Sequence, residues 1–403
     1  MRRRRSLFVG LALLVLLAGL GVMQQVLEKT AAAQSKAAVQ APRFEVDPMW
    51  PKPLPNHWVM GNVIGVGVDS QDHVYIIHRG AGSLEPKEIY AAANPPASEC
   101  CLPAPPVLEF DAEGNLVKSW GGPKPGAPYE WPESNHGITP DAKGNLWIGG
   151  NGGNDGHILK FTQDGKFLMQ VGIKQAGLGP DSNSQERFYL VAKVSVDAKT
   201  NEVYVADGYG NKRVVVIDGD TGKFKRYWGA YGNKPSDEPA PSRYTNGSQP
   251  LQQFRGPVHC ADISVDNLIY VCDRTSDRLQ VFSREGKFQK EIFVAPDSLG
   301  DGSTWDVAFS KDAEQKYMYI ADGRNQKLRI YDRKSLAELT NFGEGGHYPG
   351  QFYSMHSIAV DSKGNLYTTE TYQGRRVQKF TYKGLGPVTK KEQGTVWPRR
   401  TTN

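Results

Sequence analysis

The chain contains 403 residues, of which 39% are hydrophobic and 23% charged, and this globular composition excludes an intrinsically disordered protein. Its net charge is +5, but Arg2 to Arg5 supply four of those charges. The rest of the chain is near neutral, which excludes a nucleic-acid partner and a polybasic lipid-binding surface on the main body.

The amino terminus has the pattern of an export segment. A basic stretch is followed by an apolar run from Leu7 to about Val22, as in a signal peptide, and the run is only slightly short for a bilayer span. We therefore expect residues 1–41 to be a signal peptide or a membrane anchor followed by a linker. In both cases the body of the protein is exported, to the periplasm or to the cell exterior.

Residues 42–384 repeat one pattern six times. Each copy has an apolar strand, a turn resembling D-x-x-G-N and an aromatic residue that opens a second strand, as in HGITPDAKGNLW and HSIAVDSKGNLY. The copies begin near residues 63, 136, 192, 259, 305 and 356. Short antiparallel strands repeated at this period are typical of propeller blades, so we predict an all-β fold, a six-bladed β-propeller.

The segments outside the repeats have separate expectations. The stretch RFEVDPMWP, residues 43–51, is expected to supply the closing strand of the last blade. Two long excursions, 81–106 and 230–257, are rich in Pro, Gly and Ser, and we interpret them as loops that form a substrate rim or lid. Residues 385–403 are expected to form a loosely attached C-terminal tail.

The four cysteines lie in a chain predicted to reach a compartment that permits disulfides. Cys100 and Cys101 are adjacent in a Pro-rich segment and lack the further ligands that a metal site would need. Cys260 and Cys272 fall on neighbouring predicted strands, where a bridge can form. The sequence leaves the pairing open.

Three of the eight histidines occupy the same repeat position on alternate copies. His136, His259 and His356 each precede the aromatic that opens the second strand by eleven residues. The first strands of propeller blades line the central axis, so equivalent positions on alternate blades form a triangle around it. In the other three copies this position holds Ile64, Ala192 and Trp305.

Three neutral imidazoles with an open fourth position form the ligand set of a catalytic zinc site. The pattern therefore predicts a Zn²⁺ ion held by His136, His259 and His356, with copper or iron as alternatives because imidazole also suits them. The competing interpretation is that each histidine is a strand-end residue hydrogen-bonded to backbone.

Side chains just past the second strands should share a rim with these histidines. The residues at those places are Arg79, Asn151, Tyr209, Arg274, Arg324 and Tyr372. Arginine can hold a carboxylate or stabilise an oxyanion, and a tyrosine beside cations can act as a base. Arg324 and Tyr372 are interpreted as structural residues that cap blade ends or pair with nearby carboxylates. Four carboxylates precede this position and are interpreted as turn or inter-blade contacts, namely Asp207, Asp273, Asp322 and Glu370.

The ordered motifs resemble the catalytic core of peptidyl-α-hydroxyglycine α-amidating lyase, a six-bladed propeller of the NHL-repeat type. The resemblance rests on IIHRG, NHGITPDAKGNLWI, VYVADGYGNKR, FRGPVHCADIS with VCDRTSDRLQVF, and MHSIAVDSKGNLY. It implies zinc bound by the three histidines, with Tyr209 as base and Arg79 and Arg274 as active-site arginines. The implied reaction cleaves a carbinolamide N–C bond and releases an amide and glyoxylate.

The chain departs from this family at several places. The family has an aspartate directly after its third histidine that helps to bind a structural calcium; here Ser357 stands there, so a Ca²⁺ ion is in doubt. The family has a methionine two places before that histidine, whereas here Ser354 stands there and Met355 follows it. The family also has a disulfide cysteine after its catalytic tyrosine, and here that place is Gly210. These changes leave the histidines untouched but make a different substrate plausible.

Three functions remain open at this stage. The leading hypothesis is an exported, zinc-dependent carbon–nitrogen lyase, expected to be a monomer, that acts on a small-molecule or peptide-terminal carbinolamide. The second is a propeller hydrolase of lactones or esters, although such enzymes usually use acidic metal ligands. The third is a non-catalytic NHL-type propeller that binds a protein or a carbohydrate and holds no metal.

Overall fold

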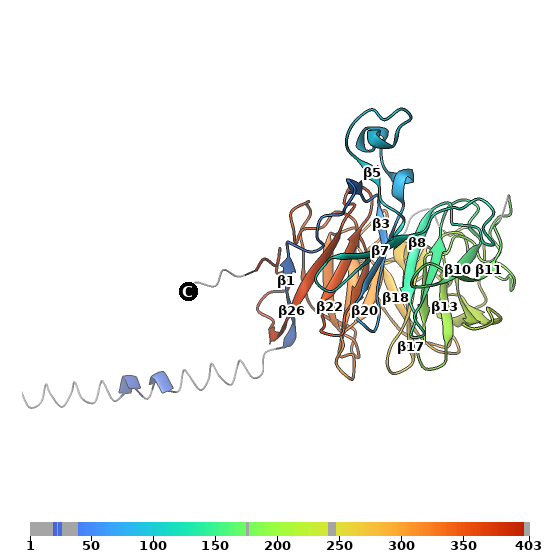
Figure 1. Cartoon of the computed structure of the whole chain (residues 1–403). Helices are drawn as coiled ribbons and strands as arrows, with labels where there is room; N and C mark the ends of the chain where they lie inside the picture. The colour runs from blue at the N-terminus through green and yellow to red at the C-terminus, as the bar shows by residue number, and fades with distance from the viewer. Residues whose placement is uncertain (1–18, 22, 26–38, 175–176, 241–246, 399–403) are drawn as a thin grey trace, which may run out of the picture.

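The computed structural model describes residues 19–21, 23–25, 39–174, 177–240 and 247–398. Within these ranges the chain forms six four-stranded antiparallel sheets arranged around one axis (Figure 1), which confirms the expected all-β six-bladed propeller. Most of the expected signal or anchor segment lies outside the described residues. Among the residues described, no helix has both the length and the apolar character that a bilayer span requires.

The blades follow one another along the chain. Blade one consists of β3 (Val63–Val68), β4 (Val74–His78), β6 (Val107–Phe110) and β7 (Leu116–Trp120). Blade two consists of β8 (Asn135–Pro140), β9 (Asn145–Gly150), β10 (His157–Thr162) and β11 (Phe167–Gly172). Blade three consists of β12 (Lys193–Val196), β13 (Glu202–Asp207), β14 (Arg213–Asp218) and β15 (Phe224–Trp228). Blade four consists of β16 (Val258–Ile263), β17 (Leu268–Asp273), β18 (Arg278–Ser283) and β19 (Phe288–Phe293). Blade five consists of β20 (Asp306–Phe309), β21 (Tyr317–Asp322), β22 (Lys327–Asp332) and β23 (Ala337–Phe342).

The sixth blade joins the two ends of the chain. It consists of β24 (Met355–Val360), β25 (Leu366–Glu370), β26 (Val377–Pro387) and, on its outer edge, β1 (Gln40–Asp47). β1 pairs antiparallel with β26 and lies beside it in Figure 1. The expected closing strand is thereby confirmed, and it removes the exposed edge that an open ring would leave.

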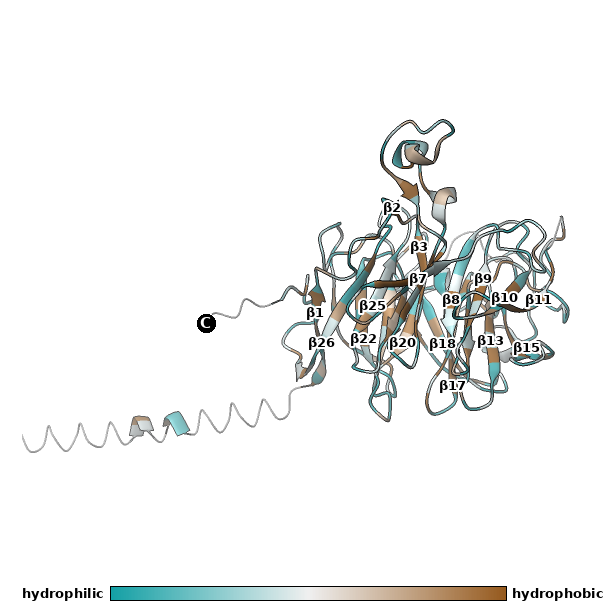
Figure 2. Cartoon of the chain, viewed as in Figure 1, coloured by the Kyte–Doolittle hydropathy of each residue, from teal (hydrophilic) through white to brown (hydrophobic). Residues whose placement is uncertain are grey.

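The aromatic residue of each repeat holds neighbouring blades together. Every such ring is at most 2% exposed and packs in the apolar cluster between its own blade and the next one; the six are Tyr75, Trp147, Tyr204, Tyr270, Tyr319 and Tyr367. Apolar residues run along the strands, whereas the loops are mostly hydrophilic (Figure 2). The hydrophobic core is therefore a closed series of six inter-blade layers, which a single blade could not bury alone.

The D-x-x-G-N turn shapes the approach to each second strand. In the second blade, Asp141 Oδ1 accepts backbone N–H groups from Lys143 and Asn145, and Asp141 Oδ2 accepts the indole N–H of Trp147 at 3.0 Å. Gly144 has φ +76°, a conformation that favours glycine. The repeat motif is therefore a turn that also fixes the inter-blade aromatic.

Two expected irregular segments contain more structure than the sequence indicated. The excursion 81–106 carries η1 (Gly80–Ser83), η2 (Pro86–Glu88), η3 (Tyr90–Ala92) and β5 (Leu102–Pro103), and β5 pairs in parallel with β2 (Trp58–Val59). It stands out from the disc in Figure 1. The expected loose tail is instead hydrogen-bonded, since Val46 N–H donates to Val396 O and Asn341 N–H to Lys391 O.

Both cysteine pairs form disulfides. Cys260 and Cys272 face each other across β16 and β17 and are fully buried, so the bridge that the sequence allowed is present. Cys100 and Cys101 form a bridge between adjacent residues on the protruding excursion.

Candidate metal centre

Each of the three repeat-position histidines is the second residue of a first strand. The pairing of β8, β16 and β24 with their second strands shifts register at this point, between Asn135 and Ile138, between Val258 and Cys260, and between Met355 and Ile358. A shift of this kind disrupts the ladder locally and redirects a side chain. Here each redirected side chain is the imidazole, which points toward the axis.

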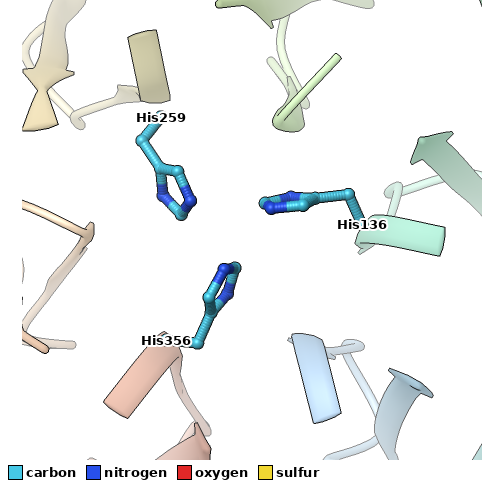
Figure 3. Close-up of side chains that lie close together, drawn as sticks. All are labelled: His136, His259 and His356. Carbon is cyan, nitrogen blue, oxygen red and sulfur yellow. The ribbon is translucent and has the colours of Figure 1, made fainter. Parts of the chain in front are cut away.

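The structure brings the three imidazoles together. One nitrogen from each of His136, His259 and His356 lies within 4.8 Å of the others, and the ring centroids are 4.8 to 5.1 Å apart. Figure 3 shows the three rings converging from three separate blades. Their exposed fractions are 1 to 3%, so the cluster is closed to bulk water on most sides.

The outer nitrogen of each imidazole is held by a backbone carbonyl of the next blade. His136 Nδ1 donates to Ala192 O at 2.6 Å and His356 Nδ1 to Ile64 O at 2.8 Å. His259 Nδ1 donates to the carbonyl of Trp305. These three acceptors are the residues that occupy the histidine position in the odd-numbered copies. With Nδ1 protonated, Nε2 carries the lone pair toward the centre, as metal ligation requires.

The electrostatics of the cluster favour neutral rings. Burial holds the pKa of all three imidazoles well below the usual value of 6.5. The nearby guanidinium of Arg274 acts in the same direction on each of them. Three neutral, convergent nitrogen donors fit a zinc ion with one open position.

Tyr209 lies directly against this cluster. Its hydroxyl oxygen is 3.0 Å from His136 Nε2 and 3.1 Å from His259 Nε2. Arg274 Nη1 donates to the same oxygen at 2.9 Å. The phenol is therefore positioned between the nitrogen donors and a fixed positive charge, which stabilises its oxygen when negatively charged.

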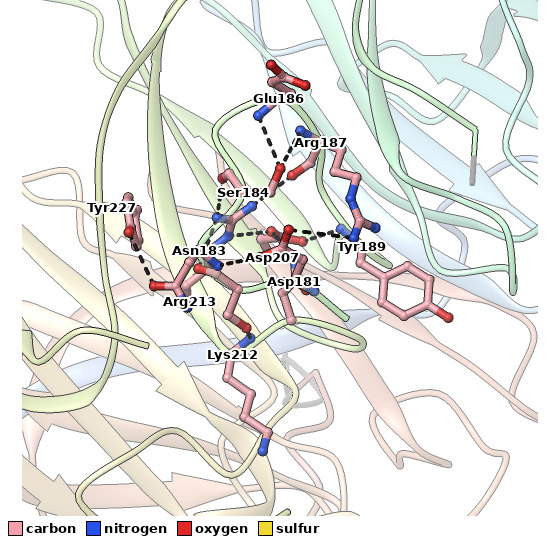
Figure 4. Close-up of polar contacts among 12 residues, drawn as sticks. Asp181, Asn183, Ser184, Glu186, Arg187, Tyr189, Asp207, Lys212, Arg213 and Tyr227 are labelled. Atoms are coloured by element: carbon pink, nitrogen blue, oxygen red, sulfur yellow. Dashed lines mark hydrogen bonds and ion pairs between the residues drawn. The ribbon is translucent and has the colours of Figure 1, made fainter. Parts of the chain in front are cut away.

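A buried ion pair holds the turn that carries Tyr209. Arg213 Nε donates to Asp207 Oδ2 at 2.8 Å, and both side chains are at most 1% exposed. The other nitrogens of Arg213 donate to carbonyls of the preceding loop, including Arg187 O at 2.8 Å, and Asp207 Oδ1 accepts the Tyr189 N–H (Figure 4). Since Asp207 is two residues from Tyr209, this network fixes the backbone from which the phenol projects.

The two arginines implied by the resemblance lie at the same end of the channel. The Arg274 guanidinium carbon is 4.4 Å from the ring centroid of Trp305, a cation–π arrangement, and among the residues that the structure describes its buried Nε has no hydrogen-bond partner. Arg79 Nη2 donates to Asn151 Oδ1 at 3.0 Å. Burial lowers the pKa of Arg79, and the nearby Tyr209 opposes this.

The remaining rim residues separate into two groups. Tyr372 is 44% exposed; burial raises the pKa of its phenol, and the charges of Arg274 and Arg79 oppose this. Arg324 is exposed. The four repeated carboxylates do not pair with Arg324 or Tyr372. Each pairs with the arginine at or near the start of the third strand, giving Asp207–Arg213, Asp273–Arg278, Asp322–Arg329 and Glu370–Arg376.

Sequence reasoning did not assign a role to Trp305. Its carbonyl holds His259, its ring lies beside Arg274, and its centroid is 5.4 Å from that of His356. A large aromatic at a position that holds Ile64 and Ala192 in the other odd copies was the available signal.

The chain has distant relatives among known proteins. No family model matches it. It is 27% identical over 241 residues to peptidyl-glycine alpha-amidating monooxygenase of Mus musculus, covering 58% of this chain and 22% of that protein. The match therefore spans only about a fifth of that relative's length.

Two shorter relatives match over most of their length. The chain is 24% identical over 318 residues to the probable peptidyl-alpha-hydroxyglycine alpha-amidating lyase of Caenorhabditis elegans, covering 78% of this chain and 81% of that protein. It is 26% identical over 314 residues to NHL repeat-containing protein 3 of Mus musculus, covering 75% of this chain and 70% of that protein.

A solved structure of a protein of unknown function from Bacteroides thetaiotaomicron shares the fold. The TM-score is 0.52 at 15% identity, over 86% of this chain and 77% of that one. Together with the sequence matches, this identifies the chain as a six-bladed β-propeller distantly related to peptidyl-α-hydroxyglycine amidating lyase and to NHL repeat proteins.

Proposed function

We propose that the protein is an exported, zinc-dependent lyase that cleaves the N–C bond of an N-acyl-α-hydroxyglycine or a similar carbinolamide. The observation that carries the proposal is the position of the Tyr209 hydroxyl, 3.0 and 3.1 Å from two histidine nitrogens and 2.9 Å from Arg274. The distant relationship to an amidating lyase supports the same reaction class.

The proposed step balances without water or an oxidant. Tyr209, as base, takes the proton of the substrate hydroxyl, the hydroxyl carbon and oxygen become a carbonyl, and the C–N bond breaks. The electron pair leaves with the nitrogen, which takes up the proton that Tyr209 removed from the hydroxyl. The products are an amide and glyoxylate.

Each residue has a defined part in this proposal. His136, His259 and His356 hold the metal, and a zinc ion, when bound, supplies Lewis acidity toward a substrate oxygen. Arg274 stabilises the Tyr209 oxygen after it has lost its own proton, and Arg79 holds the substrate carboxylate. Burial of the three rings keeps competing solvent away from the reacting atoms.

Metal analysis combined with a glyoxylate-release assay tests the proposal. The purified full chain is assayed with an N-acyl-α-hydroxyglycine, alongside Tyr209→Phe and a control, Tyr382→Phe. Tyr382 packs on Phe44 in the outer part of the sixth blade. We expect wild type and Tyr382→Phe to release glyoxylate and bind one zinc per chain, whereas Tyr209→Phe keeps the zinc and loses activity about 100-fold or more.

The alternatives give different results in the same experiment. Zinc without glyoxylate release would refute this substrate class and leave a metal-binding propeller. A wild-type chain that binds no metal and releases no glyoxylate would support the scaffold function instead.

The proposed location rests on separate observations. The chain forms two disulfides, which persist in oxidising compartments, and it carries the basic and apolar pattern of an export segment. Cell fractionation of the tagged full chain tests export. Recovery of the protein in the cytoplasm with free thiols would contradict it.

A further inference from the structure

A second polar cluster lies directly beneath the histidine ring. Lys193, Asp306 and Ser357 each follow a residue that builds the ring, namely Ala192, Trp305 and His356. Lys193 Nζ is 2.6 Å from Asp306 Oδ1, and Ser357 Oγ donates to Asp306 Oδ2 at 2.7 Å. The cluster therefore links the third, fifth and sixth blades on the axis.

A second carboxylate completes the surroundings of the ammonium. Lys193 Nζ is 3.0 Å from Asp262 Oδ2, and Ser195 Oγ donates to Asp262 Oδ1 at 2.9 Å. The exposed fractions of the three charged side chains are 13% for Lys193, 19% for Asp262 and 2% for Asp306. One cation is thus enclosed by two carboxylates from two further blades.

With the ammonium of Lys193 between Asp262 and Asp306, the cluster does not fit a calcium ion, although one oxygen of each carboxylate lies within 4.8 Å of the other. Calcium takes six to eight oxygen ligands, but the ammonium occupies the place from which an ion would reach both carboxylates, and the hydroxyl of Ser357 is already bonded to Asp306. The position that Lys193, Asp306 and Ser357 occupy in their blades holds glycine in the first two blades, namely Gly65 and Gly137. A Cβ added there would lie 2.8 and 2.9 Å from a neighbouring carbonyl oxygen, so these blades supply no side-chain ligand. The fourth blade has Cys260 there, whose sulfur is in a disulfide.

We propose that the ammonium of Lys193 is the resident cation of the axis, in place of the calcium that the family resemblance implies, and that shortening Lys193 creates a calcium site between Asp262 and Asp306. The ammonium joins blades three, four and five through direct ion pairs and reaches blade six through Asp306 and Ser357. The inference is independent of the proposed lyase activity, because it concerns what stabilises the ring.

An ion can reach this cluster without crossing the histidine ring. A cavity of about 240 Å³ opens at the far ends of the first strands, and Lys193 and Asp262 line it together with Pro140, Phe309 and Val360. The histidines lie at the opposite ends of their strands. Calcium added to a variant would therefore enter from the face away from the zinc site.

The test compares thermal unfolding and bound calcium in the zinc-loaded full chain with and without millimolar CaCl₂. We expect wild type to bind no calcium and to show no shift in Tm. Lys193→Ser should lose about 5 °C or more without calcium, because two buried carboxylates lose their partner, and should recover a large part of this on binding one calcium per chain. Lys193→Met, which removes the charge but fills the space, should lose stability without recovering it.

Each result decides the proposal. One calcium per chain in wild type, lost in Asp306→Asn, would overturn it even if Lys193→Ser failed to fold. A Lys193→Ser protein that unfolds at the wild-type temperature, or that is destabilised but takes up no calcium, would overturn it as well. Calcium-dependent recovery in Lys193→Met equal to that in Lys193→Ser would show that the ion binds elsewhere.

Discussion

The imidazole of His356 donates its Nδ1 hydrogen to the carbonyl of Ile64, a residue 292 positions earlier in the chain. This bond crosses from the innermost strand of the sixth blade to the first blade, whereas β1 pairs at the outer edge of the sixth blade. The orientation of one candidate metal ligand thus depends on the two ends of the propeller being joined. Metal affinity and ring closure are coupled through it.

Removing one imidazole should abolish tight metal binding. We expect His259→Ala to weaken zinc affinity by more than about 100-fold, because even loss of an outer hydrogen-bond partner typically costs 10- to 100-fold. Competition with a chromophoric chelator measures this. His347→Ala is the matched control, since His347 is exposed and stacks on Tyr353 outside the ring. Equal zinc affinity in both variants would remove His259 from the ligand set.

Arg274 should act on the chemical step more than on substrate binding. Arg274→Lys keeps the charge but loses the planar group that lies over Trp305 and reaches Tyr209. We expect kcat for glyoxylate release to fall about 100-fold with a smaller change in KM. Arg284→Lys, on the outer side of the third and fourth blades where Arg284 contacts Glu202, serves as the control. A change confined to KM would indicate a substrate-binding role instead.

The Asp207–Arg213 pair should support both stability and Tyr209. Asp207→Ala leaves a buried guanidinium without its carboxylate, which costs about 3 kcal/mol or more. We expect a lower Tm in thermal unfolding and a lower kcat in the fraction that remains folded. Asp218→Ala, at a more exposed turn, should change neither by a comparable amount. Full activity in folded Asp207→Ala would show that the ion pair does not position the phenol.

Asp277 gives the fold a defined pH dependence. Burial, with Asp322 and Asp273 nearby, raises its pKa from 3.8 to about 7. Between pH 3.8 and about pH 7 the folded chain binds more protons at Asp277 than the unfolded chain does. The free energy of unfolding therefore falls as the pH rises through this range, and this carboxyl causes no further change above it. Asp277→Asn removes this loss, and asparagine tolerates the φ of 52° found there.

The measurement for Asp277 is Tm as a function of pH. The difference between Asp277→Asn and wild type should grow in favour of the variant from pH 5 to pH 8. A difference that stays constant, or that shrinks as pH rises, would mean that the carboxyl is already ionised at low pH.

The buried disulfide should contribute to stability, and the exposed one should not. Replacing Cys260 and Cys272 by alanine opens a short loop between adjacent strands, and we expect a loss of about 2 to 3 kcal/mol. Cys100 and Cys101 lie on the protruding excursion. Changing both to serine should leave the Tm within about one degree of the wild-type value. Scans with and without reductant on all three proteins check the assignment.

The sequence predicted the fold because its repeat encodes inter-blade packing. An aromatic such as Trp147 recurs at a fixed distance from a turn aspartate, and both the burial of the ring and its hydrogen bond to Asp141 follow from that spacing. The same spacing placed three histidines on alternate blades. These features are local to one repeat, so a single chain is enough to recognise them.

Features that depend on contacts between repeats were not predictable in this way. The ring of Trp305 lies beside Arg274 of the neighbouring blade, with its centroid 4.4 Å from the guanidinium carbon. Lys193 meets Asp306 across 113 positions of chain. No periodic pattern links such pairs, because each depends on where two different loops or strands meet in space.

The pairing of β1 with β26 also sets an order of events during synthesis. β1 is made before the other strands of the propeller, yet its partner strand ends at Pro387, so β1 stays unpaired until the strands of all six blades have been translated. The three imidazoles cannot take up their final arrangement before the sixth blade, which carries His356, has been made. Completion of this propeller is therefore a late event in synthesis, and any ion that the three imidazoles hold would be bound after the sixth blade has formed.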